Sequence, residues 1–265
     1  MYSFGYHRPK SLAEAAKALA GASDGKLLAG GHTLIPTLKQ RLANPSDLID
    51  LSGVAELKGI REEGGAIVVG AMTPHAEVAA SEVVKRAIPA LAVLADGIGD
   101  AQVRNRGTIG GSIANNDPAA DYPAACVGLG ATIVTDKRRI PADEFFKGLF
   151  ETALQAGEII TAVSFPKPEK AGYAKFPNPA SRYAIVGVMA AKTRDGVRVA
   201  VTGAGPCVFR DKGIEQALSS SFSADAVKGS SASAGNLNSD IHASAEYRQH
   251  LIGVMAKRAV EAAGR

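Results

Sequence analysis

The chain is poor in cysteine and in aromatic residues. Among its 265 residues are two cysteines, six tyrosines, eight phenylalanines and no tryptophan. An iron–sulfur cluster takes four thiolates and zinc sites of the Cys-x-x-Cys type need paired cysteines, so Cys126 and Cys207 supply neither. Cys126 lies in an apolar run and is predicted to be a small core residue. No metal centre is therefore expected in this chain.

Long apolar runs and a strong net charge are absent as well. No run approaches the roughly 20 apolar residues that span a bilayer, and the N-terminal segment lacks the basic and apolar regions of a signal peptide. A cytoplasmic protein without a transmembrane segment is therefore predicted. The net charge is only +4, and the one basic cluster, Lys137-Arg138-Arg139, is predicted to be a solvated turn. With so few stacking aromatics, nucleic acid is not an expected partner.

Glycine, in contrast, is abundant and gathers in two loops. These loops are Ala29-Gly30-Gly31-His32-Thr33 and Thr108-Ile109-Gly110-Gly111-Ser112. Each is predicted to follow a strand. Glycines permit a positive φ and a close approach of the backbone to a ligand, and successive N–H groups in such turns form an anion-binding hollow. Two such loops predict a dinucleotide held by its pyrophosphate, although two ordinary tight turns are the alternative.

The surroundings of the first loop are predicted from local patterns. A short strand at 26–28 leads into the loop, and a helix is predicted from residue 33 to residue 43. Leu34, Leu38 and Leu42 recur there at helical spacing and are expected on one face. The N-terminus of this helix would add its dipole to the anion site. The Gly-x-Gly-x-x-Gly fingerprint of Rossmann folds and the Walker loop are absent, so a dinucleotide must be bound differently.

Other local signals predict mixed α and β structure in both halves of the chain. Ser11-x-x-Glu14 has the spacing of a capping box, and Thr73-Pro74 is typical of a helix start, with Thr73 as the cap. The remaining predicted elements are hairpins around 62–65 and 194–196, strands at 131–135 and 158–165, helical stretches from 81 to 94 and from 244 to about 263, and a loop-like stretch from 219 to 239.

The two loops also resemble the FAD signatures of one family. This family comprises the flavoprotein (medium) subunits of carbon monoxide dehydrogenase and related molybdenum hydroxylases, and it resembles the flavin region of xanthine dehydrogenase. The resemblance is carried by the segments 6–15, 29–36, 108–121 and 175–184. It implies an α+β fold with a two-part FAD-binding domain of the p-cresol methylhydroxylase type at 1–175. The subdomains would be about 1–55 and 56–175, and a small α+β C-terminal domain would follow at 176–265.

The resemblance also implies roles for single residues. The backbone of Ala29–Thr33 and Thr108–Ser112 would hold the pyrophosphate. Asp121 would contact the flavin, Ile160 would touch its ring, Lys175 would favour its anionic reduced form, and Tyr183 would lie beside the isoalloxazine.

From the residues alone, several alternatives stay open. His32 could instead close a turn, Asp121 could cap a short helix, and Tyr183 could be a core residue. The remaining histidines, His75 among them, have no metal-ligand spacing and are predicted to be surface or hydrogen-bonded residues. The chain departs from the family at Arg182, where many relatives have an acidic residue, and less markedly at Ser112 and Thr33.

The resemblance implies an electron-transfer subunit without catalytic acid–base residues of its own. It would carry FAD and pass electrons from iron–sulfur clusters to quinone, NAD or oxygen. The molybdenum cofactor would reside on a large subunit and two [2Fe–2S] clusters on a small subunit, in a dimer of heterotrimers. Two alternatives are a stand-alone flavin oxidoreductase on the same fold and a nucleotide-binding or scaffold module that has lost its flavin.

Overall fold

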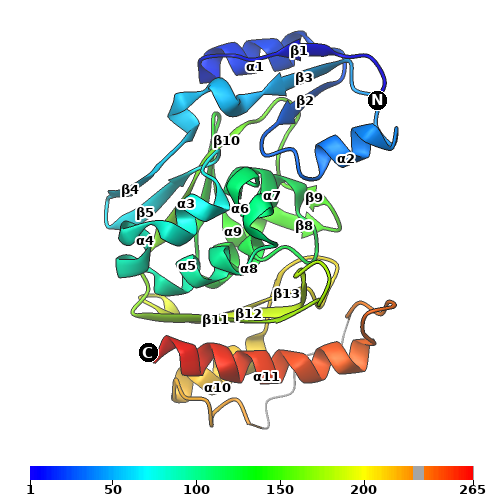
Figure 1. Cartoon of the computed structure of the whole chain (residues 1–265). Coiled ribbons are helices and arrows are strands. Elements are labelled where there is room, and N and C mark those ends of the chain that lie inside the picture. The colour runs from blue at the N-terminus through cyan, green and yellow to red at the C-terminus, as the bar shows by residue number, and fades with distance from the viewer. Residues whose placement is uncertain (229–235, 265) are drawn as a thin grey trace.

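The computed structural model describes residues 1–228 and 236–264. Its three larger sheets are stacked, with helices between and around them (Figure 1), and β8 (Phe146–Gly148) and β9 (Glu151–Thr152) form a small fourth sheet. The first sheet is parallel and has the order β1-β3-β2. Its strands and accompanying helices are β1 (Gly5–His7), α1 (Leu12–Gly21), β2 (Gly25–Leu28), α2 (Leu34–Lys39) and β3 (Asp47–Asp50), followed by the 3-10 turns η1 (Leu51–Gly53) and η2 (Ala55–Leu57).

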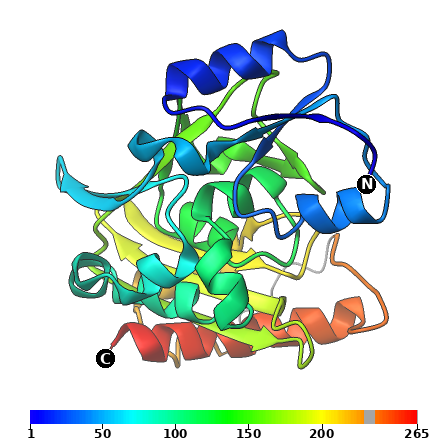
Figure 2. The same cartoon turned by 45° about the horizontal axis from the view of Figure 1, so that its top comes forward.

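Helix α1 begins as predicted, and α2 is shorter than predicted. The Ser11 hydroxyl accepts from the Glu14 N–H at 3.2 Å, and the Glu14 carboxylate accepts from the Lys10 N–H at 2.7 Å. Helix α2 ends at Lys39 because the chain turns at Arg41, which has a φ of 60°. Leu42 therefore leaves the predicted face and is 73% exposed. Figure 2, with the top of the molecule turned forward, shows α2 on the same side as the N-terminus.

The second sheet is antiparallel and has the order β4-β5-β10-β6-β7. The predicted hairpin at 62–65 is confirmed, with Gly64 and Gly65 at positive φ between its two strands. This part of the chain contains β4 (Ile60–Glu63), β5 (Ala66–Gly70), α3 (His75–Ala80), α4 (Glu82–Ala87), α5 (Pro89–Asp96), α6 (Ala101–Arg106), α7 (Ile109–Asn115), α8 (Tyr122–Gly128), β6 (Thr132–Thr135), β7 (Arg139–Pro141), α9 (Ala142–Phe145), β8 (Phe146–Gly148), β9 (Glu151–Thr152) and β10 (Ile160–Pro166).

Two predictions in this part are wrong in detail. The second glycine loop follows helix α6, not a strand, and Gly110 and Gly111 lie in the first turn of α7. The Thr73 hydroxyl does not cap α3, because it donates to the Gly59 carbonyl at 3.1 Å, and the cap position falls on Pro74. At both positions, hydrogen bonds to residues distant in the sequence are present where the local sequence pattern predicts other contacts.

The third sheet lies between two helical layers (Figure 1). It is antiparallel, in the order β11-β12-β13-β14, and the predicted hairpin at 194–196 joins β12 to β13. Helix α11 contacts β11 and β12, while α5 and α8 contact the sheet on the side of the second sheet. The elements are β11 (Lys170–Pro177), β12 (Ala184–Thr193), β13 (Gly196–Thr202), β14 (Phe209–Arg210), α10 (Lys212–Ser220) and α11 (Ala245–Ala263).

The hydrophobic core is continuous between the third sheet and helices α5 and α8. Tyr173 and Met189 of the third sheet belong to the same buried cluster as Leu94 of α5 and Cys126 of α8, so Cys126 is a core residue as predicted. The loop predicted from 219 to 239 lies partly outside the described residues. Among the residues that the structure describes, no helix has the length and apolar composition needed to cross a membrane.

Candidate functional site

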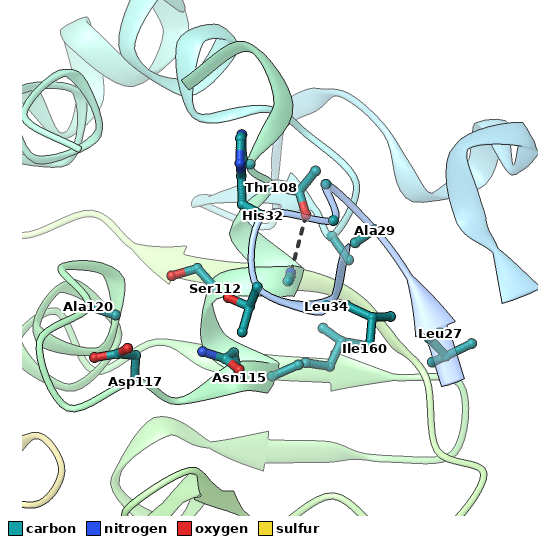
Figure 3. Close-up of a pocket in the computed structure, with 18 of the residues that line it drawn as sticks. Leu27, Ala29, His32, Leu34, Thr108, Ser112, Asn115, Asp117, Ala120 and Ile160 are labelled. Carbon is teal, nitrogen blue, oxygen red and sulfur yellow. Dashed lines mark hydrogen bonds between the residues drawn. The ribbon is translucent and has the colours of Figure 1, made fainter. Parts of the chain in front are cut away.

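A cavity of about 550 Å³ lies where the two glycine loops meet. Its size is within the range of small-molecule and cofactor sites. The first loop and α2 form one wall, α7 and the residues after it form another, and Ile160 of β10 lies between them (Figure 3). The predicted site residues that line the cavity are Ala29, Gly30, Gly31, His32, Thr33, Thr108, Gly110, Gly111, Ser112, Asp121, Ile160 and Tyr183.

The first loop is in direct backbone contact with residues 106 and 107, which lead into the second loop. A Cβ atom on Gly30 would lie 2.3 Å from the Arg106 carbonyl oxygen and 2.8 Å from the Gly107 Cα. Both neighbours are backbone atoms, so they cannot move aside as the end of a side chain can. Gly31 has a φ of +77°, in the left-handed region that favours glycine. Glycine at position 30 therefore allows the first loop to pack closely on residues 106 and 107, immediately before the second loop.

The first loop leaves its backbone donors free. Within residues 1–228 and 236–264, the N–H groups of Gly30, Gly31, His32 and Thr33 donate no hydrogen bond. The carbonyl of Gly31 accepts from the N–H of Ile35 at 2.9 Å, and this bond holds the loop against α2. Four consecutive free donors at the wall of a cavity form the hollow that an anionic oxygen requires.

In the second loop, the backbone N–H groups of residues 109–112 all donate to acceptors within the protein. The N–H groups of Ile109 and Gly110 donate to the carbonyls of Thr73 and Ala71, at 3.2 and 2.9 Å. The N–H of Gly111 donates to the Thr108 hydroxyl at 3.2 Å, which caps α7, and Ser112 bonds to the Thr108 carbonyl at 3.0 Å. Ile109 is fully buried and does not line the cavity. These four N–H groups are therefore already used and are not available to a ligand in the cavity.

Asp121 and Lys175 form a buried ion pair beside the cavity. The Lys175 ammonium lies 2.9 and 3.1 Å from the two carboxylate oxygens of Asp121, and it also donates to the Gly97 carbonyl at 2.8 Å. The Tyr173 hydroxyl donates to the same carboxylate. Burial raises the pKa of Asp121, and Lys175 and Tyr173 act in the opposite direction. Asp121 makes no capping bond to α8, and Lys175 does not line the cavity.

Glu158 and Arg138 form a second ion pair that the sequence did not reveal. Glu158 lines the cavity, and its carboxylate accepts from Arg138 at 2.8 and 3.0 Å and from the Thr135 hydroxyl at 2.8 Å. The hydrogen bonds from Arg138 lower the pKa of Glu158 to about 2, against the effect of burial. Arg138 is exposed in a turn, as predicted, and in addition its guanidinium pairs with Glu158.

His75 is the other residue that sequence analysis missed. It was expected at the surface or hydrogen-bonded, but it is 5% exposed, lines the cavity, and its buried Nδ1 atom has no hydrogen-bond partner among the described residues. Burial lowers its pKa to about 4. The remaining unpredicted lining residues that Figure 3 labels are Leu27, Leu34, Asn115, Asp117 and Ala120.

Comparison with known families identifies this arrangement. The model described as the FAD binding domain in molybdopterin dehydrogenase matches residues 2–168, and that of the CO dehydrogenase flavoprotein C-terminal domain matches residues 171–263. The chain belongs to the FAD-binding family of molybdopterin dehydrogenases. The recognised relatives are oxidoreductase subunits, so the predicted family, α+β fold and cofactor class are confirmed.

Individual relatives match this family member over nearly its whole length. The carbon monoxide dehydrogenase medium chain of Hydrogenophaga pseudoflava is 37% identical, over 98% of this chain and 96% of the relative. The nicotine 6-hydroxylase medium subunit of Paenarthrobacter nicotinovorans is 36% identical, with the same coverage. The structure of the Hydrogenophaga enzyme lacking the Mo-pyranopterin moiety has a TM-score of 0.86 at 38% identity, covering 98% of this chain and 97% of that chain. Reconstituted CO dehydrogenase from Oligotropha carboxidovorans has a TM-score of 0.89 at 33% identity, with the same two coverages.

The residues around the cavity fit FAD. Free N–H groups in the first loop suit the phosphate oxygens, and the close contact of Gly30 with residues 106 and 107 brings this loop next to the start of the second. The apolar side chains of Leu27, Leu34 and Ile160 suit the flat ring systems at either end of the molecule. The site therefore has a polar centre for the anionic middle of FAD and apolar surfaces beside it.

Proposed function

We propose that this chain is the electron-transfer subunit of a molybdenum hydroxylase complex. It would receive electrons from two [2Fe–2S] clusters on a small partner subunit and deliver them to quinone, NAD or oxygen. The molybdenum cofactor would lie on a large partner subunit, in a dimer of heterotrimers. The observation that carries this proposal is the cavity between the two glycine loops, in a chain whose two cysteines cannot hold a cluster.

The chain's own residues bind, orient and shield the cofactor, while bound FAD supplies the redox chemistry. We assign the phosphates to the free donors of residues 29–33, with residues 108–112 as the facing wall. Asp121, Ile160 and Tyr183 would contact the flavin from the other side of the cavity. Lys175 would act one layer further out, because its ammonium holds Asp121 and the Gly97 carbonyl without reaching the cavity.

The division into domains near residue 175, with subdomains at about 1–55 and 56–175, is part of the same proposal. The proposed boundary falls within β11 (Lys170–Pro177), whose pairing with β12 places it in the third sheet. The cytoplasmic location remains a prediction from the sequence.

Purification of the chain alone and from its native source tests the proposal. The single chain is expected to carry one flavin, measured by absorbance, and to oxidise no substrate by itself. The native preparation is expected to contain two further chains, with iron and molybdenum in metal analysis. Substrate oxidation by the pure single chain would contradict the proposal and favour a stand-alone flavin oxidoreductase.

A further inference from the structure

The His75 ring lies against Gly107, the residue that immediately precedes the second glycine loop. His75 is the first residue of α3, and its backbone N–H donates to the Gly107 carbonyl at 3.0 Å. A Cβ atom on Gly107 would lie 2.5 Å from His75 Nε2, so the missing side chain leaves room for this ring edge. Gly107 and His75 both line the cavity. Since a Cβ on Gly30 would lie 2.8 Å from the Gly107 Cα, His75 and Gly30 both adjoin Gly107.

The two nitrogens of this ring differ in their surroundings. Within the part of the chain that the structure describes, Nδ1 is buried without a partner, as is the hydroxyl of Tyr122, whose ring centroid is 5.2 Å away. Nε2 makes no hydrogen bond within the described residues but is not enclosed in the same way. A neutral imidazole carries one N–H, and a buried N–H without an acceptor is rarer than a buried lone pair without a donor. We therefore assign the hydrogen to Nε2, beside Gly107.

The environment keeps the ring neutral. Burial lowers the pKa of His75 to about 4, and the nearby charges of His32 and Arg104 act in the same direction. A neutral ring has one N–H donor and carries no charge that a neighbouring group would have to compensate. Since Nε2 has no hydrogen-bond acceptor among the described residues and His75 lines the cavity, its N–H can donate to a ligand there.

We propose that His75 is a further cofactor-binding residue, whose Nε2–H donates to a phosphate oxygen of FAD where the two glycine loops meet. The inference rests on the proposed placement of the phosphates at these loops. It identifies a donor on the side of the second loop, where four backbone N–H groups are already used. The anionic middle of the cofactor is then held by free amides on one side and by an imidazole on the other.

Binding measurements with two variants test this role. In the full chain, H75F keeps a ring of similar shape against Tyr122 but removes the donor, whereas H75Q keeps an N–H donor near the position of Nε2. H75F is expected to weaken FAD about tenfold or more, because a hydrogen bond to a charged group is lost. It is expected to weaken ADP, used as a competitor, by a similar factor and to leave the affinity for riboflavin, which has no phosphate, unchanged. H75Q is expected to recover most of the FAD affinity.

Imidazole ¹⁵N resonances provide a readout that a purely structural role would not change. The His75 signals are expected to move when ADP is added, while those of exposed His250 on α11 stay in place. The matched variant H250Q is expected to bind FAD as the wild type does.

Equal FAD affinity of H75F and wild type would overturn the inference, as would a parallel loss of FAD and riboflavin. If wild-type chain bound FAD but ADP neither competed nor shifted His75, the inference would fail while FAD binding stood. Failure of the wild type to bind FAD would overturn the proposed function itself, and this inference with it.

Discussion

The two glycine loops look alike in sequence and differ in the structure. Residues 29–33 follow a strand, and four of their N–H groups donate no hydrogen bond within the described residues, whereas the N–H groups of residues 109–112, at the start of α7, all donate within the protein. Glycine also serves different purposes in them. Gly30 allows the loops to touch, while a Cβ on Gly110 would meet the Cβ of Ala71 at 2.6 Å, beneath the helix. A glycine pair is thus a signal of close packing, and only the hydrogen bonds show which loop can bind an anion.

The largest effect is expected at the contact between the loops. Gly30→Ala should cost about 3 kcal/mol, because the new Cβ meets backbone atoms of residues 106 and 107. Flavin content, measured by absorbance after gel filtration, should fall strongly while the third sheet remains folded. Gly21→Ala is the matched control, since nothing lies within 4 Å of its Cβ position. Normal flavin content in the Gly30 variant would show that the loops do not need this contact.

Lowering the pH is expected to reduce the stability of the fold through protonation of His75. Between about pH 6.5 and 4 the unfolded chain binds a proton at His75 and the folded chain does not, because burial lowers the pKa to about 4. The free energy of unfolding should therefore decrease as the pH falls through this window, by about 3 kcal/mol in total. Urea unfolding at several pH values measures it. A variant with Phe at position 75 should lack this part of the slope, and an unchanged slope would contradict the assignment.

A moderate effect is expected from a branched side chain in the second loop. A Cβ on Gly111 would lie 3.1 Å from the Thr108 hydroxyl and 3.4 Å from the Ala29 Cβ, so Gly111→Val overfills the space between the loops. We expect a cost of about 2 kcal/mol and loss of flavin on dialysis. The folding of the third sheet, followed by circular dichroism, should not change. Full retention of flavin by this variant would count against the placement of the phosphates.

The smallest effect on stability is expected for substitutions of the two threonines, Thr108 and Thr33, one from each loop. Thr108 caps α7 through its hydroxyl, so Thr108→Ala should lower the stability of the flavin-free chain by about 1 kcal/mol. Thr33 makes no capping bond, so Thr33→Ala should leave that stability nearly unchanged. Thermal unfolding of the two variants measures the difference. Equal losses would mean that the loops are more alike than their hydrogen bonds indicate.

The sequence predicted much of the local structure. The capping box at Ser11, the hairpin at residues 62–65 and the final helix depend on contacts between near neighbours in the chain, and the structure has all three. The family and FAD also followed from the sequence, because the glycine motifs are continuous segments. Helix α2 was overextended because leucine spacing does not reveal that the chain turns at Arg41.

Only the tertiary structure decided which groups at the site are used and which are free. Lys175 reaches Asp121, Arg138 reaches Glu158, and the His75 ring lies against Gly107, each across tens of residues of chain. Long-range contacts of this kind depend on how sheets and helices pack, and no local sequence pattern predicts them. The sequence by itself therefore determined the class of ligand and the two loops. Packing determined that the first loop has N–H groups available to a ligand, that residues 109–112 use theirs within the protein, and that His75 lies against Gly107.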